Sequence, residues 1–164
     1  MDEFSRAATL EDLKLLLRSL HAHEVDYLLF GGYALAAHGY LCATTDIDLI
    51  VPATAESGRR VKAALMVLPD RAAKNLEPEW FNDGHHIRVA DAFIVDLLFS
   101  ANGQTFDMLR RYAESFDFDG IPVKTVSLEG LLLTKQTMRD KDTADRIVIE
   151  QALESFGRRD ASPP

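Results

Sequence analysis

The chain has 164 residues, 47% of them hydrophobic, and a formal net charge of −8. Its length and composition predict one globular domain spanning residues 1–164. The acidic balance disfavours a protein that coats nucleic acid, because such a protein needs a basic surface. The single cysteine, Cys42, excludes an intramolecular disulfide and a thiolate zinc site within one chain.

The N-terminal segment is acidic and lacks the basic and then apolar order of a signal peptide. No apolar run is long enough to cross a membrane. We therefore expect a cytoplasmic protein without a membrane partner.

Apolar periodicity and capping residues predict alternating helices and strands. Helices are expected at residues 10–21, 33–38, 54–68, 105–112, 127–137 and 141–156. Strands are expected at residues 27–30, 46–51, 86–89, 92–99, 115–118 and 121–126, with an irregular segment at 69–84. This order indicates an α/β (α+β) fold, in which helices pack on a small mixed β-sheet.

Asp46 and Asp48 lie in an apolar strand, where residues two apart point to the same face. Their Cα atoms are then roughly 6–7 Å apart, which allows the two carboxylates to hold divalent cations. A bare Asp-x-Asp is more often the solvated face of a strand. Other residues must therefore decide between the two interpretations.

Three further features bear on that decision. Gly31 and Gly32 separate a strand from a helix, and such a junction can bind phosphate through backbone N–H groups. Asp96 interrupts the apolar run 92–99, and in a strand beside Asp46 and Asp48 it completes a three-carboxylate cluster suited to two-metal phosphoryl chemistry. Lys135 and Arg139 share a helix face and could neutralise phosphate.

Each of these features also has a bland interpretation. The glycine pair can serve only as a tight turn, and the segment containing Lys135 can be a solvated helix end. His85 and His86 point to opposite sides of a strand, which favours a structural role over joint chelation. Trp80 and Phe81 can stack on a base or cover the core, and Cys42 is expected to be a buried, inert thiol.

Taken together, the stretch GGYALAAHGYLCATTDIDLIV and the later TKQTMRDKDTAD resemble the nucleotidyltransferase superfamily. The similarity is greatest to minimal bacterial members of the abortive-infection and toxin–antitoxin type. These combine a glycine pair, a Thr-x-Asp-Ile-Asp string, a third carboxylate on a later strand and a Lys-x-x-x-Arg-x-Lys-Asp-x-x-Asp string. The last string corresponds here to Lys135, Arg139, Lys141, Asp142 and Asp145.

The resemblance implies an enzyme that transfers a nucleotidyl group from a nucleoside triphosphate (NTP) to an acceptor hydroxyl and releases pyrophosphate. It implies that Asp46, Asp48 and Asp96 hold Mg²⁺, and that Asp96 also serves as the base. The residues that it places at the nucleotide are Gly31, Gly32, Thr45, Lys135, Lys141 and Asp142.

Two positions depart from the common pattern of such proteins. Cys42 stands where many of them have an arginine, and Gly32 stands where a serine is common. The acceptor is open between a protein, a tRNA and a small molecule, and a homodimer or a partner protein could help to recognise it. The alternative function is a non-catalytic, antitoxin-like binding protein on the same fold; a third possibility is an acidic domain whose aspartates have no ligand.

Overall fold

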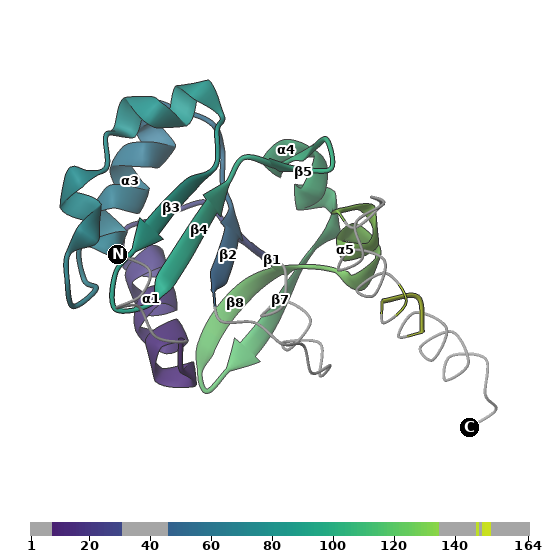
Figure 1. Ribbon diagram of the computed structural model, residues 1–164. Helices are drawn as coiled ribbons and strands as arrows, with labels where there is room; N and C mark the ends of the chain where they lie inside the picture. The colour runs from purple at the N-terminus through teal and green to yellow at the C-terminus, as the bar shows by residue number, and fades with distance from the viewer. Residues whose placement is uncertain (1–7, 31–45, 135–146, 148, 152–164) are drawn as a thin grey trace.

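The structure is a computed structural model that describes residues 8–30, 46–134, 147 and 149–151 (Figure 1). The helix expected at 33–38 lies outside the described residues, as does most of the one expected at 141–156. The described part combines helices with a mixed β-sheet, which confirms the expected α/β (α+β) class.

A six-stranded sheet forms the centre of the fold, with the strand order β3-β4-β2-β1-β8-β7. Its strands are β1 (Leu28–Phe30), β2 (Ile47–Ile50), β3 (Ile87–Ala90), β4 (Ile94–Leu98), β7 (Ala113–Phe118) and β8 (Ile121–Val126). β2 runs parallel to β4 and β1 runs parallel to β8, whereas the other neighbouring pairs are antiparallel. All six expected strands are thus present, with ends shifted by a residue or two. A small two-stranded sheet of β5 (Ser100–Ala101) and β6 (Gln104–Thr105) was not predicted.

Helices begin where short polar side chains can accept hydrogen bonds from free backbone N–H groups. The α-helices are α1 (Leu10–Ala22), α3 (Ala55–Leu65), α4 (Phe106–Leu109) and α5 (Leu128–Thr134). Thr9 and Asp12 form a reciprocal capping box at the start of α1, as the sequence predicts. Thr54, Thr105 and Ser127 cap the other three. α3 ends at Leu65, earlier than the expected residue 68.

The core lies between the sheet and the helices α1 and α3 (Figure 1). Ile47 and Leu49 of β2, with Val95 and Leu97 of β4, are fully buried on one face of the sheet. The two helices touch each other there, where the hydroxyl of Ser19 donates to the carbonyl of Ala64 at 2.6 Å. The alternation of a strand then turns Asp48 and Asp96 to the opposite face.

The segment expected to be irregular contains two short 3-10 helices. These are η2 (Ala72–Asn75) and η3 (Pro78–Asp83), and a further 3-10 helix, η4 (Arg110–Tyr112), follows α4. Gly58 of α3 lets η3 approach closely, since a Cβ atom at this position would lie 2.7 Å from the carbonyl oxygen of Pro78. Phe81 is buried in the core, whereas Trp80 is an exposed hydrophobic residue.

A single buried carboxylate joins this segment to the sheet. Asp91, in the turn between β3 and β4, accepts hydrogen bonds from the backbone N–H groups of Asp70, Ala72 and Ala92 at 2.7–2.9 Å. Because these three donors are backbone groups, Asp91 fixes the path of the chain here.

The hairpin of β7 and β8 has the turn that the sequence predicts. Asp119 and Gly120 both have positive φ angles, of 52° and 85°. Two such residues in succession characterise the hairpin turns that match the twist of a sheet. Asp119 also forms an ion pair with Lys14, which ties the turn to α1.

Candidate active site: a carboxylate cluster on the central strands

The structure brings two of the three predicted metal-binding carboxylates onto adjacent central strands. Asp48 of β2 is directly opposite Asp96 of the parallel strand β4. Neighbouring strands are about 4.8 Å apart, so the two side chains leave the same face of the sheet side by side. Asp46 lies two residues before Asp48, where a strand would direct it to that face as well.

Asp96 is held by Arg88 of β3 and by His86, the residue directly before this strand. The register of β3 and β4 pairs Arg88 with Asp96. Nε of Arg88 donates to Oδ1 of Asp96 at 3.0 Å, and Nε2 of His86 lies 2.9 Å from the same oxygen. Neither contact uses Oδ2, which leaves one carboxylate oxygen outside this network.

Arg88 also reaches the first carboxylate of the Asp-x-Asp pair. Its Nη2 lies 3.5 Å from Oδ2 of Asp46, at the limit of a hydrogen bond. One guanidinium therefore spans Asp46 and Asp96. This contact also shows that Asp46 lies on the same side of the sheet as Asp96. We call Asp46, Asp48, Asp96, His86 and Arg88 the carboxylate cluster.

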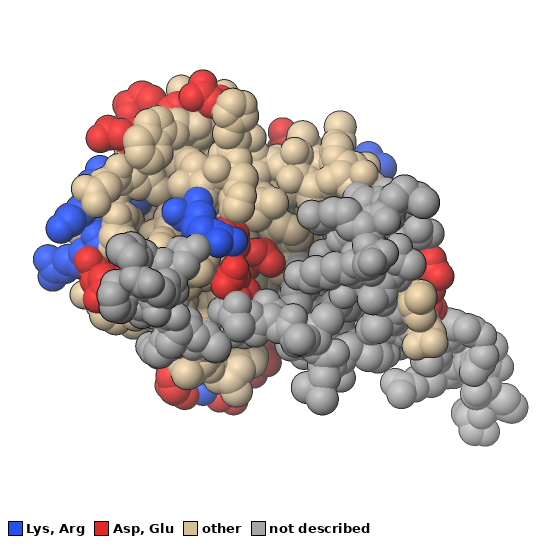
Figure 2. All heavy atoms as spheres, in the orientation of Figure 1, with Lys and Arg blue, Asp and Glu red and all other residues tan. Residues whose placement is uncertain are grey.

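Burial differs sharply within the carboxylate cluster. The side chain of Asp96 is only 8% exposed, whereas those of Arg88 and His86 are 44% and 48% exposed. A buried carboxylate is costly without compensation, and here compensation comes from groups that remain in contact with water. Figure 2 shows acidic and basic side chains together over the middle of this face, beside residues that are not described.

The predicted nucleotide-binding residues cannot be placed in this way. Gly31, Gly32, Cys42 and Thr45 lie outside the described residues, as do Lys135, Arg139, Lys141, Asp142 and Asp145. The described part of the chain does show where β1 leads. β1 ends at Phe30, which pairs with Asp48, so the chain leaves this strand beside the carboxylate cluster.

The donor chemistry of the carboxylate cluster fits a hard divalent cation. Mg²⁺ prefers oxygen ligands and often uses only one or two carboxylates, with water and phosphate oxygens completing its coordination. Among the described residues, no three His, Cys, Asp or Glu side chains are arranged closely enough to hold a metal. Instead, the Arg88 guanidinium contacts both Asp46 and Asp96.

His86 and Arg88 were not identified as site residues from the sequence. The sequence pattern favours a structural role for His86 and indicates no role for Arg88. One signal in the sequence could have identified them. His86 and Arg88 are two residues apart in an expected strand, and a short turn joins that strand to the strand of Asp96. That signal becomes specific only when the hairpin register is known, since a shift by one residue would send both side chains to the other face.

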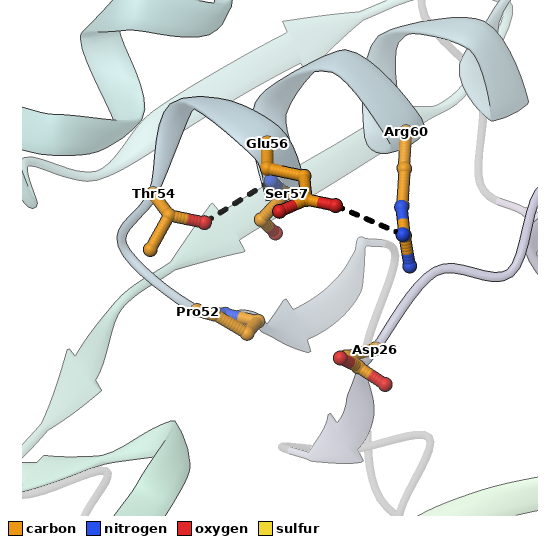
Figure 3. A pocket seen from close by; sticks show the side chains of 6 residues that line it. All are labelled: Asp26, Pro52, Thr54, Glu56, Ser57 and Arg60. Carbon is orange, nitrogen blue, oxygen red and sulfur yellow. Dashed lines mark hydrogen bonds and ion pairs between the residues drawn. The ribbon is translucent and has the colours of Figure 1, made fainter.

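A separate polar pocket of about 300 Å³ lies at the opposite end of β2 from Asp46 (Figure 3). It is lined by Asp26, Pro52, Thr54, Glu56, Ser57 and Arg60. Arg60 donates to Glu56 at 3.0 Å and to the carbonyl of Glu24 at 3.1 Å. Within the described residues the buried Ser57 hydroxyl has no hydrogen-bond partner. The pocket lacks adjacent carboxylates on one strand face and is not the phosphoryl-transfer site that the sequence predicts.

Comparison of the chain with models of known families and with curated proteins gives no match. In the described residues, no helix has the length and apolar character needed to cross a bilayer.

Proposed function

We propose that the chain is a nucleotidyltransferase that moves a nucleotidyl group from an NTP to an acceptor hydroxyl. The observation that carries the proposal is the register of Asp48 opposite Asp96 on parallel central strands, with Asp46 two residues away. The resemblance of the sequence to this superfamily calls for carboxylates on two strands in this relation. Such an arrangement combines a cation site with a proton acceptor on a rigid part of the sheet.

Asp46 and Asp48 would hold Mg²⁺, together with Asp96. When bound, Mg²⁺ would neutralise the triphosphate and stabilise the developing charge on the attacking and leaving oxygens. The acceptor oxygen forms a bond to the α-phosphorus, and the bond from this phosphorus to the pyrophosphate oxygen breaks. Asp96 takes the proton from the acceptor hydroxyl. The pairing of β4 with β2 and β3 fixes the position of Asp96 on the sheet.

The non-catalytic binding protein remains the second candidate. A single buried Asp96, whose charge is compensated by Arg88 and His86, would fit either function. A protein that binds only through its surface has no need of three neighbouring carboxylates, two on central strands and Asp46 directly before β2. The presence of all three supports the enzyme.

Thermal unfolding with Mg²⁺ and each of the four common NTPs tests binding. A ligand at 100 times its dissociation constant stabilises the folded state by about 2.7 kcal/mol. We expect this for the wild type and not for the double variant Asp46→Asn with Asp48→Asn. The matched control, Asp83→Asn with Asp117→Asn, removes two exposed carboxylates and should behave as the wild type does. The enzyme is excluded if no NTP shifts the wild type.

Catalysis is tested by incubation with α-labelled NTPs and cell extract. We expect label on an acceptor with the wild type and the control variant, and none with the double variant. Binding of an NTP without any labelled product would favour the non-catalytic protein.

A further inference from the structure

Arg88 is unlike an ordinary surface arginine. Its guanidinium contacts Asp96 of β4 at 3.0 Å and Asp46, the residue directly before β2, at 3.5 Å. Arg60 provides the comparison, since its side chain is 43% exposed against 44% for Arg88. Arg60 pairs with one glutamate on its own helix, an arrangement that adds only a few tenths of a kcal/mol. Arg88 instead pairs across strands with a carboxylate that is nearly fully buried.

A positive charge in this place has a direct electrostatic consequence. Asp46, Asp48 and Asp96 offer negative charge to a divalent cation, and Arg88 cancels part of it. A cation that binds between the carboxylates also meets the repulsion of the guanidinium within a few ångströms. At such separations the repulsion between a single and a double charge changes affinity by about tenfold even with solvent-like screening.

We propose that the Arg88 guanidinium is the counter-ion of the three aspartates in the absence of metal and that a divalent cation displaces it. The released guanidinium then binds the triphosphate. The proposal rests on the proposed function and adds a nucleotide-binding residue to it. The half-exposed side chain has room to turn towards solvent while β3 stays paired with β4. A guanidinium is suited to the second role because its parallel N–H groups match two phosphate oxygens.

The exchange predicts effects of opposite sign on two ligands. Without the charge of residue 88, the bare cation should bind more tightly, because its competitor is gone. The nucleotide complex should bind more weakly, because one phosphate contact is gone. A purely structural role for Arg88 would weaken both ligands together, since a disordered site binds nothing well.

Two titrations of the whole chain test the exchange, one with Mn²⁺ alone and one with Mg²⁺ and the NTP that stabilises the wild type. Arg88→Gln removes the charge and keeps an N–H donor for Asp96. We expect its affinity for Mn²⁺ to rise about tenfold and its affinity for the nucleotide to fall about tenfold. Arg88→Lys retains the charge and should leave Mn²⁺ affinity close to that of the wild type. Arg60→Gln is the matched control and should change neither affinity.

The outcomes separate this proposal from the proposed function. If the wild type binds the nucleotide but Arg88→Gln leaves Mn²⁺ affinity unchanged or lowers it, the exchange is wrong and the proposed function stands. If Mn²⁺ affinity rises without loss of nucleotide affinity, the contact of Arg88 with the triphosphate is wrong. If the wild type binds neither Mn²⁺ nor any nucleotide, both proposals fail. Should Arg88→Gln not fold, Arg88→Met is measured against the same expectations.

Discussion

Asp91 and Asp96 belong to the same β3–β4 hairpin and are almost equally buried, with 3% and 5% exposed. Asp91 accepts hydrogen bonds from three backbone N–H groups. Asp96 contacts two half-exposed side chains, those of His86 and Arg88. Backbone partners cannot leave without unfolding the loop, whereas side-chain partners can rotate away. Two equally buried carboxylates thus have different roles. Asp91 fixes the path of the chain, whereas the partners of Asp96 can be exchanged.

The largest expected effect comes from Asp91→Ala. It leaves three backbone N–H groups near the core without their acceptor, and we expect the free energy of unfolding to fall by about 3 kcal/mol. Urea denaturation measures this change. Asp117→Ala, at an exposed position of β7, is the control and should have almost no effect. A loss below about 1 kcal/mol for Asp91→Ala would show that its hydrogen bonds do not hold the loop.

A smaller change in stability is expected for Asp96→Asn. The amide oxygen can still accept from Arg88, and the partners of residue 96 are solvated enough to tolerate the lost charge. We expect a loss of about 1 kcal/mol in the same denaturation experiment, together with a complete loss of stabilisation by Mg²⁺ and NTP. If Asp96→Asn destabilises the protein as much as Asp91→Ala does, the distinction between the two carboxylates is wrong.

Asp46→Asn should change stability still less. The Asp46 side chain is 25% exposed and its contact with Arg88 is long. Surface ion pairs of this kind contribute little, so we expect a difference within about 0.5 kcal/mol by urea denaturation. The same variant should bind Mg²⁺ and NTP more weakly than the wild type. Unchanged binding would remove Asp46 from the proposed site.

The smallest effect on stability is expected for the contact between His21 and Tyr27, whose side chains are both uncharged at neutral pH. Nε2 of His21 lies 2.9 Å from the hydroxyl of buried Tyr27. Burial of the ring, and then the charge of Lys124, lower the pKa of His21 from its usual 6.5, while burial raises the pKa of Tyr27 to about 12. Both groups are therefore neutral in the folded protein at neutral pH.

The sign of the pH dependence follows from the lowered pKa of His21. As pH falls below 6.5, the unfolded chain takes up this proton before the folded protein does. The stabilisation is complete above 6.5 and is lost as pH falls through the folded pKa. Urea denaturation between about pH 7 and pH 5 should show a steeper loss for the wild type than for His21→Gln. Equal slopes would mean that His21 does not contribute.

The local parts of the fold could be predicted from the sequence because their causes lie within a few residues. Thr9 and Asp12 supply both halves of a capping box, and Asp119 and Gly120 supply the two positive φ angles of a hairpin turn. The small sheet of β5 and β6 was missed because its strands are too short for a period of two to be visible.

The candidate site was only partly predictable because its geometry depends on which strands become neighbours. The spacing of Asp46 and Asp48 already places them on one face. The position of Asp96 opposite Asp48 requires the parallel pairing of β2 and β4, which no local pattern determines. The contact of Arg88 with Asp96 requires the β3–β4 register in addition. The sequence therefore predicts contacts within a strand, whereas contacts between strands are known only from the structure.

The strand order predicts that β3, which carries Arg88, opens locally more often than β2 and β4, which carry Asp48 and Asp96. Within the described part of the chain, β3 is one of the two edge strands of its sheet, whereas β2 and β4 lie inside it. Outer strands open locally at a lower free energy than inner strands, whose amide protons exchange with solvent only when most of the domain unfolds. The strand that carries Arg88 and leads from His86 can therefore detach for short times while Asp48 and Asp96 stay in register. Asp48 and Asp96 thus keep their positions during motions of β3 that leave the rest of the fold intact, and rotation of the Arg88 side chain away from them needs no such motion.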